Sequence, residues 1–131
     1  MSEPIEMGIR DMLRTKTELL SLLANDTRKI DLDYTGNART YIVFYKAAGG
    51  MSRYVSTDDG IYTFHCYGAS RHAAMSLATA LAGVLHAVDS EAYNGTYLYH
   101  AEVLNTYYQP DNTWERYIIS ARVRATTDLP V

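Results

Sequence analysis

The segment from Ser70 to Val88 constrains the fold of this chain more than any other part of its sequence. Apolar side chains recur along it at spacings of three and four residues, as in an amphipathic helix: Ala74, Leu77, Ala78, Leu81, Val84, Leu85 and Val88. Ser70 is a suitable N-cap, and the many small residues would let the helix lie close against a sheet. The least polar stretch, 73–88, falls short of the roughly 20 apolar residues of a membrane span, so it predicts a core helix.

Two runs rich in β-branched and aromatic residues precede this helix, and two follow it. Residues 41–47 and 61–67 predict the first two strands, and residues 96–107 and 114–125 predict the last two. Each pair most simply forms a hairpin. Asp58-Asp59-Gly60 has the composition of a turn, so we expect a turn at these residues, just before the second strand.

The N-terminal part predicts two short helices, Ile5 to Leu13 and Glu18 to Ala24, with Thr17 as the cap of the second. Residues 28–40 are expected to form a connecting loop that contains a short extended piece at Ile30 to Tyr34. The whole chain, 1–131, is expected to be a single domain. The predicted fold class is α+β: an antiparallel sheet of two β-hairpins, with one long Ala-rich helix (about 70–88) packed on it and the N-terminal helices alongside.

The charge, the cysteine count and the aromatic content indicate which kinds of binding this protein favours. With 15 acidic and 12 basic residues the net charge is −3, which disfavours duplex binding through phosphate neutralisation. The single cysteine, Cys66, excludes an internal disulfide and is expected to be a small buried residue. The chain has 12 tyrosines but only 2 phenylalanines. This excess of tyrosine favours aromatic surfaces that are partly exposed to solvent, such as protein interfaces, although strand surfaces also favour tyrosine.

No catalytic, cofactor or metal site is expected. His65 and Cys66 are adjacent on a predicted strand, so their side chains would point to opposite faces. His65 could meet His100 only if their strands paired, and a third metal ligand would still be missing. Gly68-Ala69-Ser70 lacks the full Gly-x-Ser-x-Gly pattern of a nucleophile elbow.

The candidate functional residues are therefore contacts with other proteins. One group is the tip of the first hairpin, with Arg53 and Tyr54. The other consists of the aromatic residues across the last turn: Tyr107, Tyr108 and Trp114. The alternative for the second group is a hairpin tip that packs on itself.

The ordered set of segments resembles the tail terminator (tail completion) family of long-tailed bacteriophages. The segments that carry the resemblance are Ile9 to Leu13, Leu19 to Leu23, Tyr41 to Tyr45, Phe64 to Ser70 leading into the Ala-rich helix, and Gln109 to Tyr117. They span nearly the whole chain, and no single one is diagnostic. The chain departs from the usual pattern in its charged 28–40 segment and its long 48–60 hairpin tip.

The resemblance implies a structural virion protein rather than an enzyme. Such a protein would form a homo-oligomeric ring, a hexamer, at the head-proximal end of the tail tube. It would stop polymerisation of the major tail tube protein and offer a joining surface to the head-completion (neck) protein. Genomic DNA would pass through the lumen without sequence-specific binding, and no membrane would be involved. The protein would be made in the host bacterial cytoplasm.

Two other readings stay open. One is another head–tail connector, a head-completion or neck protein, which would bind the portal side rather than the tube. The other is a small non-viral ligand-binding or interaction domain, with His65, His100 or Glu102 in a pocket. The second reading needs at least two of these side chains to converge in a cleft.

Overall fold

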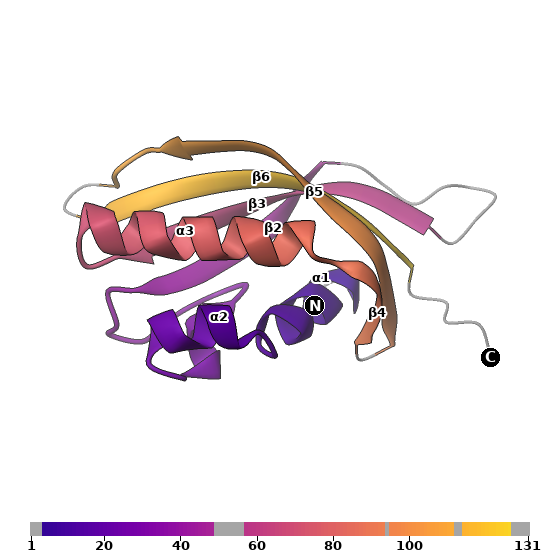
Figure 1. The fold of residues 1–131 in the computed structure, drawn as a ribbon, viewed down its shortest axis with the longest axis horizontal. Helices are drawn as coiled ribbons and strands as arrows, with labels where there is room; N and C mark the ends of the chain where they lie inside the picture. The colour runs from indigo at the N-terminus through magenta and orange to yellow at the C-terminus, as the bar shows by residue number, and fades with distance from the viewer. Residues whose placement is uncertain (1–3, 49–56, 94, 112–113, 127–131) are drawn as a thin grey trace.

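A six-stranded sheet with helices on one side forms the structure (Figure 1), a computed structural model that describes residues 4–48, 57–93, 95–111 and 114–126. The helical elements are α1 (Pro4–Leu13), α2 (Thr17–Leu20), the 3-10 turns η1 (Ser21–Leu23) and η2 (Thr27–Lys29), and α3 (Arg71–His86). The strands are β1 (Ile30–Asp31), β2 (Tyr41–Ala48), β3 (Thr57–Gly68), β4 (Asp89–Tyr93), β5 (Thr96–Tyr108) and β6 (Glu115–Thr126).

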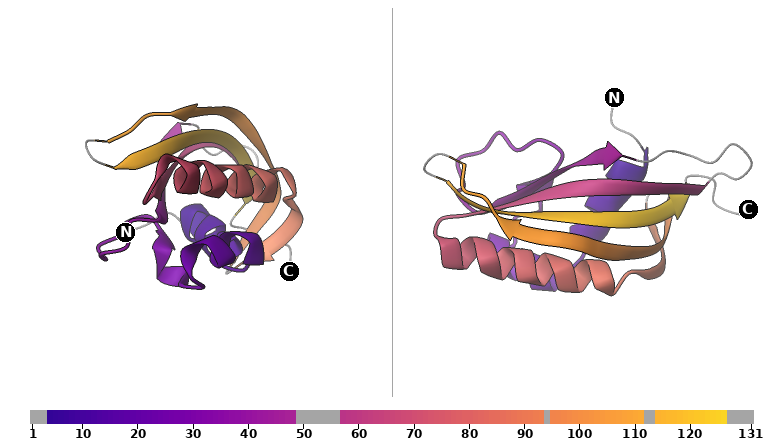
Figure 2. Two further views of the ribbon diagram at one scale, coloured as in Figure 1. Left: turned by 60° about the vertical axis from the view of Figure 1, so that its left-hand side comes forward. Right: turned by 90° about the horizontal axis from the view of Figure 1, so that it is seen from above.

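The sheet has the strand order β1-β2-β3-β6-β5-β4. β1 runs parallel to β2, whereas β2, β3, β6, β5 and β4 pair antiparallel with their neighbours. The sheet curls over the helices, which lie on its concave side (Figure 2). In the described part of the chain, no helix combines the length and the apolar character needed to cross a bilayer.

The predicted fold class is wrong. Strands make up 48% of the structure, and the sheet is mixed rather than a purely antiparallel sheet of two hairpins. Within the short extended piece expected at residues 30–34, residues 30–31 form the strand β1, which pairs in parallel with β2. Residues 89–93 form a further strand, directly after α3, that was not expected from the sequence. The helix itself is shorter than expected, ending at His86, and the chain as a whole is mostly β.

The turn expected at residues 58–60 is also wrong, because these residues lie inside β3. Asp58 is buried there, and its carboxylate meets the ammonium group of Lys46 on β2. A buried acid is tolerated in a strand only when its charge is compensated. This long-range ion pair therefore overrides the local preference of Asp-Gly for a turn.

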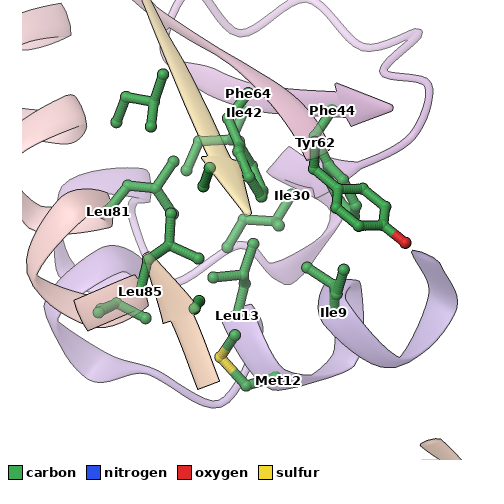
Figure 3. Packing of buried hydrophobic residues seen from close by; sticks show 14 of the residues in the cluster. Ile9, Met12, Leu13, Ile30, Ile42, Phe44, Tyr62, Phe64, Leu81 and Leu85 are labelled. Carbon is green, nitrogen blue, oxygen red and sulfur yellow. The ribbon is translucent and has the colours of Figure 1, made fainter. Parts of the chain in front are cut away.

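The core lies between the concave face of the sheet and the helices (Figure 3). Helix α1 contributes Ile9, Met12 and Leu13, and α3 contributes Leu81 and Leu85. The strands supply side chains that are fully buried against them: Ile42, Phe44, Tyr62 and Phe64. Alternation along β2 and β3 sends one side chain in two into this core.

The helix ends follow the sequence only in part. Ser70 caps α3 as predicted, since the Ala73 N–H donates to its Oγ at 3.1 Å. Thr17 does not cap α2, because Lys16 takes the N-cap position and the Thr17 hydroxyl bonds to the Glu18 carboxylate instead.

Candidate protein interface on the helix-free face

The face of the sheet opposite the helices carries the side chains that alternate with the core. On β2 these include Tyr41 and Tyr45, and on β3 they include His65 and Tyr67. Tyr45 is 50% exposed. This face therefore shows aromatic rings where a sheet that met only water would show small polar or charged groups.

Four aromatic side chains form what we call the aromatic patch: Tyr34, Tyr41, Tyr67 and Trp114. Tyr41 stacks on Tyr67 with ring centroids 4.7 Å apart, and the ring centroids of Tyr34 and Tyr41 are 4.5 Å apart. Trp114 meets both Tyr41 and Tyr67 edge-on at 6.4 Å. Such pairs add to the free energy of packing beyond the area that they bury, so they hold the patch in one shape.

Arginines stand over this patch. The guanidinium carbon of Arg39 lies 5.1 Å from the centroid of the Trp114 ring, within cation–π range. Arg39 is exposed and has no ion pair among the described residues. Its charge is thus held in place by an aromatic ring and stays open to an outside carboxylate.

Arg116 links the patch to His65. Its Nη1 lies 3.2 Å from Nδ1 of His65, and its Nε donates to the Gln109 carbonyl oxygen at 2.9 Å. Because a guanidinium cannot accept a hydrogen bond, Nδ1 of His65 is the acceptor and its proton sits on Nε2. Burial, and then the charge of Arg116, lower the pKa of His65, so the ring is neutral near pH 7.

Of the five contact residues proposed from the sequence, the three that the structure describes do not form a single group. Arg53 and Tyr54 lie outside the described residues. Tyr107 pairs with Ile118 and is exposed on the helix-free face, whereas Tyr108 pairs with Tyr117 and points to the helical side.

Tyr108 belongs to a separate cluster at the start of α3. Its hydroxyl donates to the Glu115 carboxylate, and the Arg71 guanidinium lies 4.1 Å above its ring. Trp114 joins the aromatic patch instead. The contact role of the five residues proposed from the sequence stays a prediction.

Sequence reasoning missed Tyr34, Arg39, Tyr41 and Tyr67. Tyr41 and Tyr67 had a detectable signal, because their strands alternate with the core positions Ile42 and Cys66. Tyr34 and Arg39 come from the segment between β1 and β2, where no periodic pattern exists to place a side chain.

The side chains considered for chemistry do not converge. His65 pairs with Ile118 and His100 pairs with Arg124, so β6 lies between the strands of the two histidines. In the described residues, no group of three or more His, Cys, Asp or Glu side chains could hold a metal ion. Cys66 is buried as predicted, and burial raises the pKa of its thiol.

A shallow cavity of about 410 Å³ lies beside the aromatic patch, along residues 26–37. Two of its acids already have cationic partners. Asp26 meets Arg28 at 3.0 Å, and Asp31 meets Arg14 at 3.1 Å. The lining of the cavity is mainly polar.

The fold and this face define a mostly β domain with an aromatic surface on the helix-free side of its sheet. No protein-family model and no curated protein matches the sequence. Among solved structures, the fold is similar to a chain in the "Virion of native gene transfer agent (GTA) particle". The TM-score is 0.70 at 15% sequence identity, over 94% of this chain and 95% of that chain. At this identity the likeness establishes a shared fold only.

Proposed function

We propose that this protein is a structural subunit of a virion. The observation that carries the proposal is the fold likeness to a virion chain over almost the full length of both chains. Because the likeness spans the whole domain, it concerns the architecture of a complete subunit and not one shared motif.

Within the virion we propose the role of tail terminator. The sequence resemblance to that family supports this role, together with the aromatic patch. A ring of identical subunits needs two different contact surfaces on each copy. The aromatic patch consists of Tyr and Trp, and Arg39 lies over it. These three residue types contribute most of the binding free energy at protein interfaces.

The mechanism would be steric. A hexameric ring seated on the head-proximal end of the tail tube covers the surface to which the next tube subunit would add. The opposite side of the ring would receive the head-completion or neck protein, and genomic DNA would pass through the lumen. A net charge of −3 suits a conduit that must not hold DNA.

Mixing the purified protein with the tail tube protein of its phage tests this role. Light scattering with mass resolution and negative-stain electron microscopy would be the readouts. Rings at tube ends, with tubes shortened as the protein concentration rises, are expected. Tubes of unchanged length and no association would overturn the terminator role. Binding to the portal side alone would then favour a neck protein.

Single substitutions test the aromatic patch within the same assay. Trp114→Ala and Tyr41→Ala remove rings from the patch, so we expect fewer capped tubes at a given protein concentration. Tyr99→Ala is the matched control, because Tyr99 is an exposed tyrosine outside the patch. Equal capping by all three variants would exclude the patch as a contact surface.

A further inference from the structure

The outer edge of β5 is open along most of its second half. β4 pairs only with residues 96–100 of β5, through register pairs from Tyr93↔Thr96 to Asp89↔His100. Residues 101–108 pair with β6 on one side, and no strand of the described chain pairs with them on the other. Their outward N–H and C=O groups are therefore available to another strand.

Exposure at residues 104–107 indicates that no other element of the described chain covers this part of the edge. Residues 104–107 are all exposed, although successive side chains point to opposite faces of the sheet. Leu104 is 41% exposed and Tyr107 is 42% exposed. Proteins usually protect such an edge with lysine or proline, and residues 101–108 contain neither. The register shift at Leu104 is a bulge, after which pairing to β6 resumes at Asn105.

The opposite end of the sheet is open as well. β1 pairs only with Ile42 and Val43 of β2. Residues 44–48 therefore have no strand on their outer side among the described residues, and Tyr45 is half exposed there. Among the described residues, each end of the sheet thus leaves a strand segment that pairs with a strand on one side only.

The two open edges have the polarity needed to pair with each other. Three successive antiparallel pairings connect β2, β3, β6 and β5, so β5 runs opposite to β2. If a second copy is related to the first by rotation about an axis parallel to the strands, its β2 points in the same direction as β2 of the first copy. Its β2 would then lie antiparallel to β5 of the first copy, which is the more favourable ladder geometry.

We propose that residues 101–108 of β5 in one copy pair antiparallel with residues 44–48 of β2 in a second copy. This inference rests on the proposed function, which requires a repeating contact between two different surfaces. Edge pairing supplies such a contact, because each copy uses β5 toward one neighbour and β2 toward the other. The backbone hydrogen bonds left open at both edges would then be satisfied.

Disulfide trapping tests the pairing and its face. Tyr45 lies on the helix-free face, as do Asn105 and Tyr107 by their register with β6. We expect Tyr45→Cys combined with Asn105→Cys or with Tyr107→Cys to give covalent multimers on oxidation in the presence of tube protein. Tyr45→Cys with Thr106→Cys is the matched control, since residue 106 points to the helical side. The native Cys66 is buried and cannot compete.

A charge on the edge gives a second test. Tyr107→Lys should abolish ring formation while the circular dichroism of the monomer stays that of the wild type. If the wild type caps tubes, neither same-face double variant cross-links and Tyr107→Lys still forms rings, edge pairing is overturned while the terminator role stands. If cross-linked multimers form but tubes are never capped, the pairing is supported and the terminator role fails. If neither occurs, both are overturned.

Discussion

The Nζ atom of Lys46 lies 2.9 Å from Oδ2 of Asp58, which joins β2 to β3 at the edge of the core. The Asp58 side chain is 1% exposed and that of Lys46 is 22% exposed. The Tyr62 hydroxyl donates to the same carboxylate oxygen at 3.4 Å. The other oxygen, Oδ1, has no hydrogen-bond partner among the described residues. The charge of this buried acid is therefore compensated mainly by one lysine.

Lys46→Met should destabilise the fold strongly, because it leaves the Asp58 carboxylate buried and uncompensated. We expect the free energy of unfolding in urea to fall by about 3 kcal/mol. The adjacent acid provides the control. Asp59 meets Arg122 at 3.9 Å on the exposed face, so Arg122→Met should cost less than about 1 kcal/mol. Equal losses for the two variants would contradict this account of the buried pair.

Gly68→Ala should prevent α3 from docking at its first turn. An added Cβ would lie 2.8 Å from Cα of Ala74 and 2.9 Å from the Ala73 carbonyl carbon, and backbone atoms cannot move aside. We expect a loss of at least about 2 kcal/mol in thermal or urea unfolding. Gly83→Ala, within α3 itself, is the control, because no atom outside its own helical turn lies within 4 Å of its Cβ position. It should stabilise the protein by about 0.5–1 kcal/mol.

His65 should make stability depend on pH. Burial and Arg116 lower its pKa in the folded state, so the unfolded state binds more protons on acidification. Stability is therefore expected to fall as the pH drops below the unfolded value of about 6.5 toward the folded pKa. His65→Gln should reduce the slope of the free energy of unfolding against pH in this range. A slope that stays as in the wild type in His65→Gln would contradict this account.

Ser70→Ala should destabilise α3 by removing its N-cap. The loss of the bond from the Ala73 N–H is expected to lower the free energy of unfolding by about 1 kcal/mol. Ser21→Ala serves for comparison, since the exposed Ser21 hydroxyl only donates back to the Glu18 carbonyl oxygen. That variant should stay close to wild type in the same denaturant titration. A similar loss in both would contradict a specific capping role for Ser70.

Local patterns could be read from the sequence where they repeat. The spacing of Leu77, Leu81 and Leu85 predicted the helix α3, and this prediction is confirmed. The fold class could not be read, because it depends on pairings between distant segments. β1 is only two residues long, and β4 contains Asp89, so neither has a strand-like composition.

Only the aromatic character of the candidate interface could be predicted from the sequence. The excess of tyrosine predicted aromatic surfaces, but the grouping of Tyr41, Tyr67 and Trp114 depends on strand order. The turn expected at Asp58 failed for a related reason. Its composition favours a turn locally, whereas the partner that permits its burial, Lys46, is 12 residues earlier in the chain.

The position of Trp114 gives the protein a built-in optical reporter. It is the only tryptophan in the chain, and it lies in the aromatic patch beneath Arg39. Its fluorescence therefore reports on one surface, with no signal from the core to subtract. A partner that covers the patch would move the indole from water into a drier environment and shift its emission to shorter wavelength. Binding at that surface can thus be followed in real time without attaching a dye.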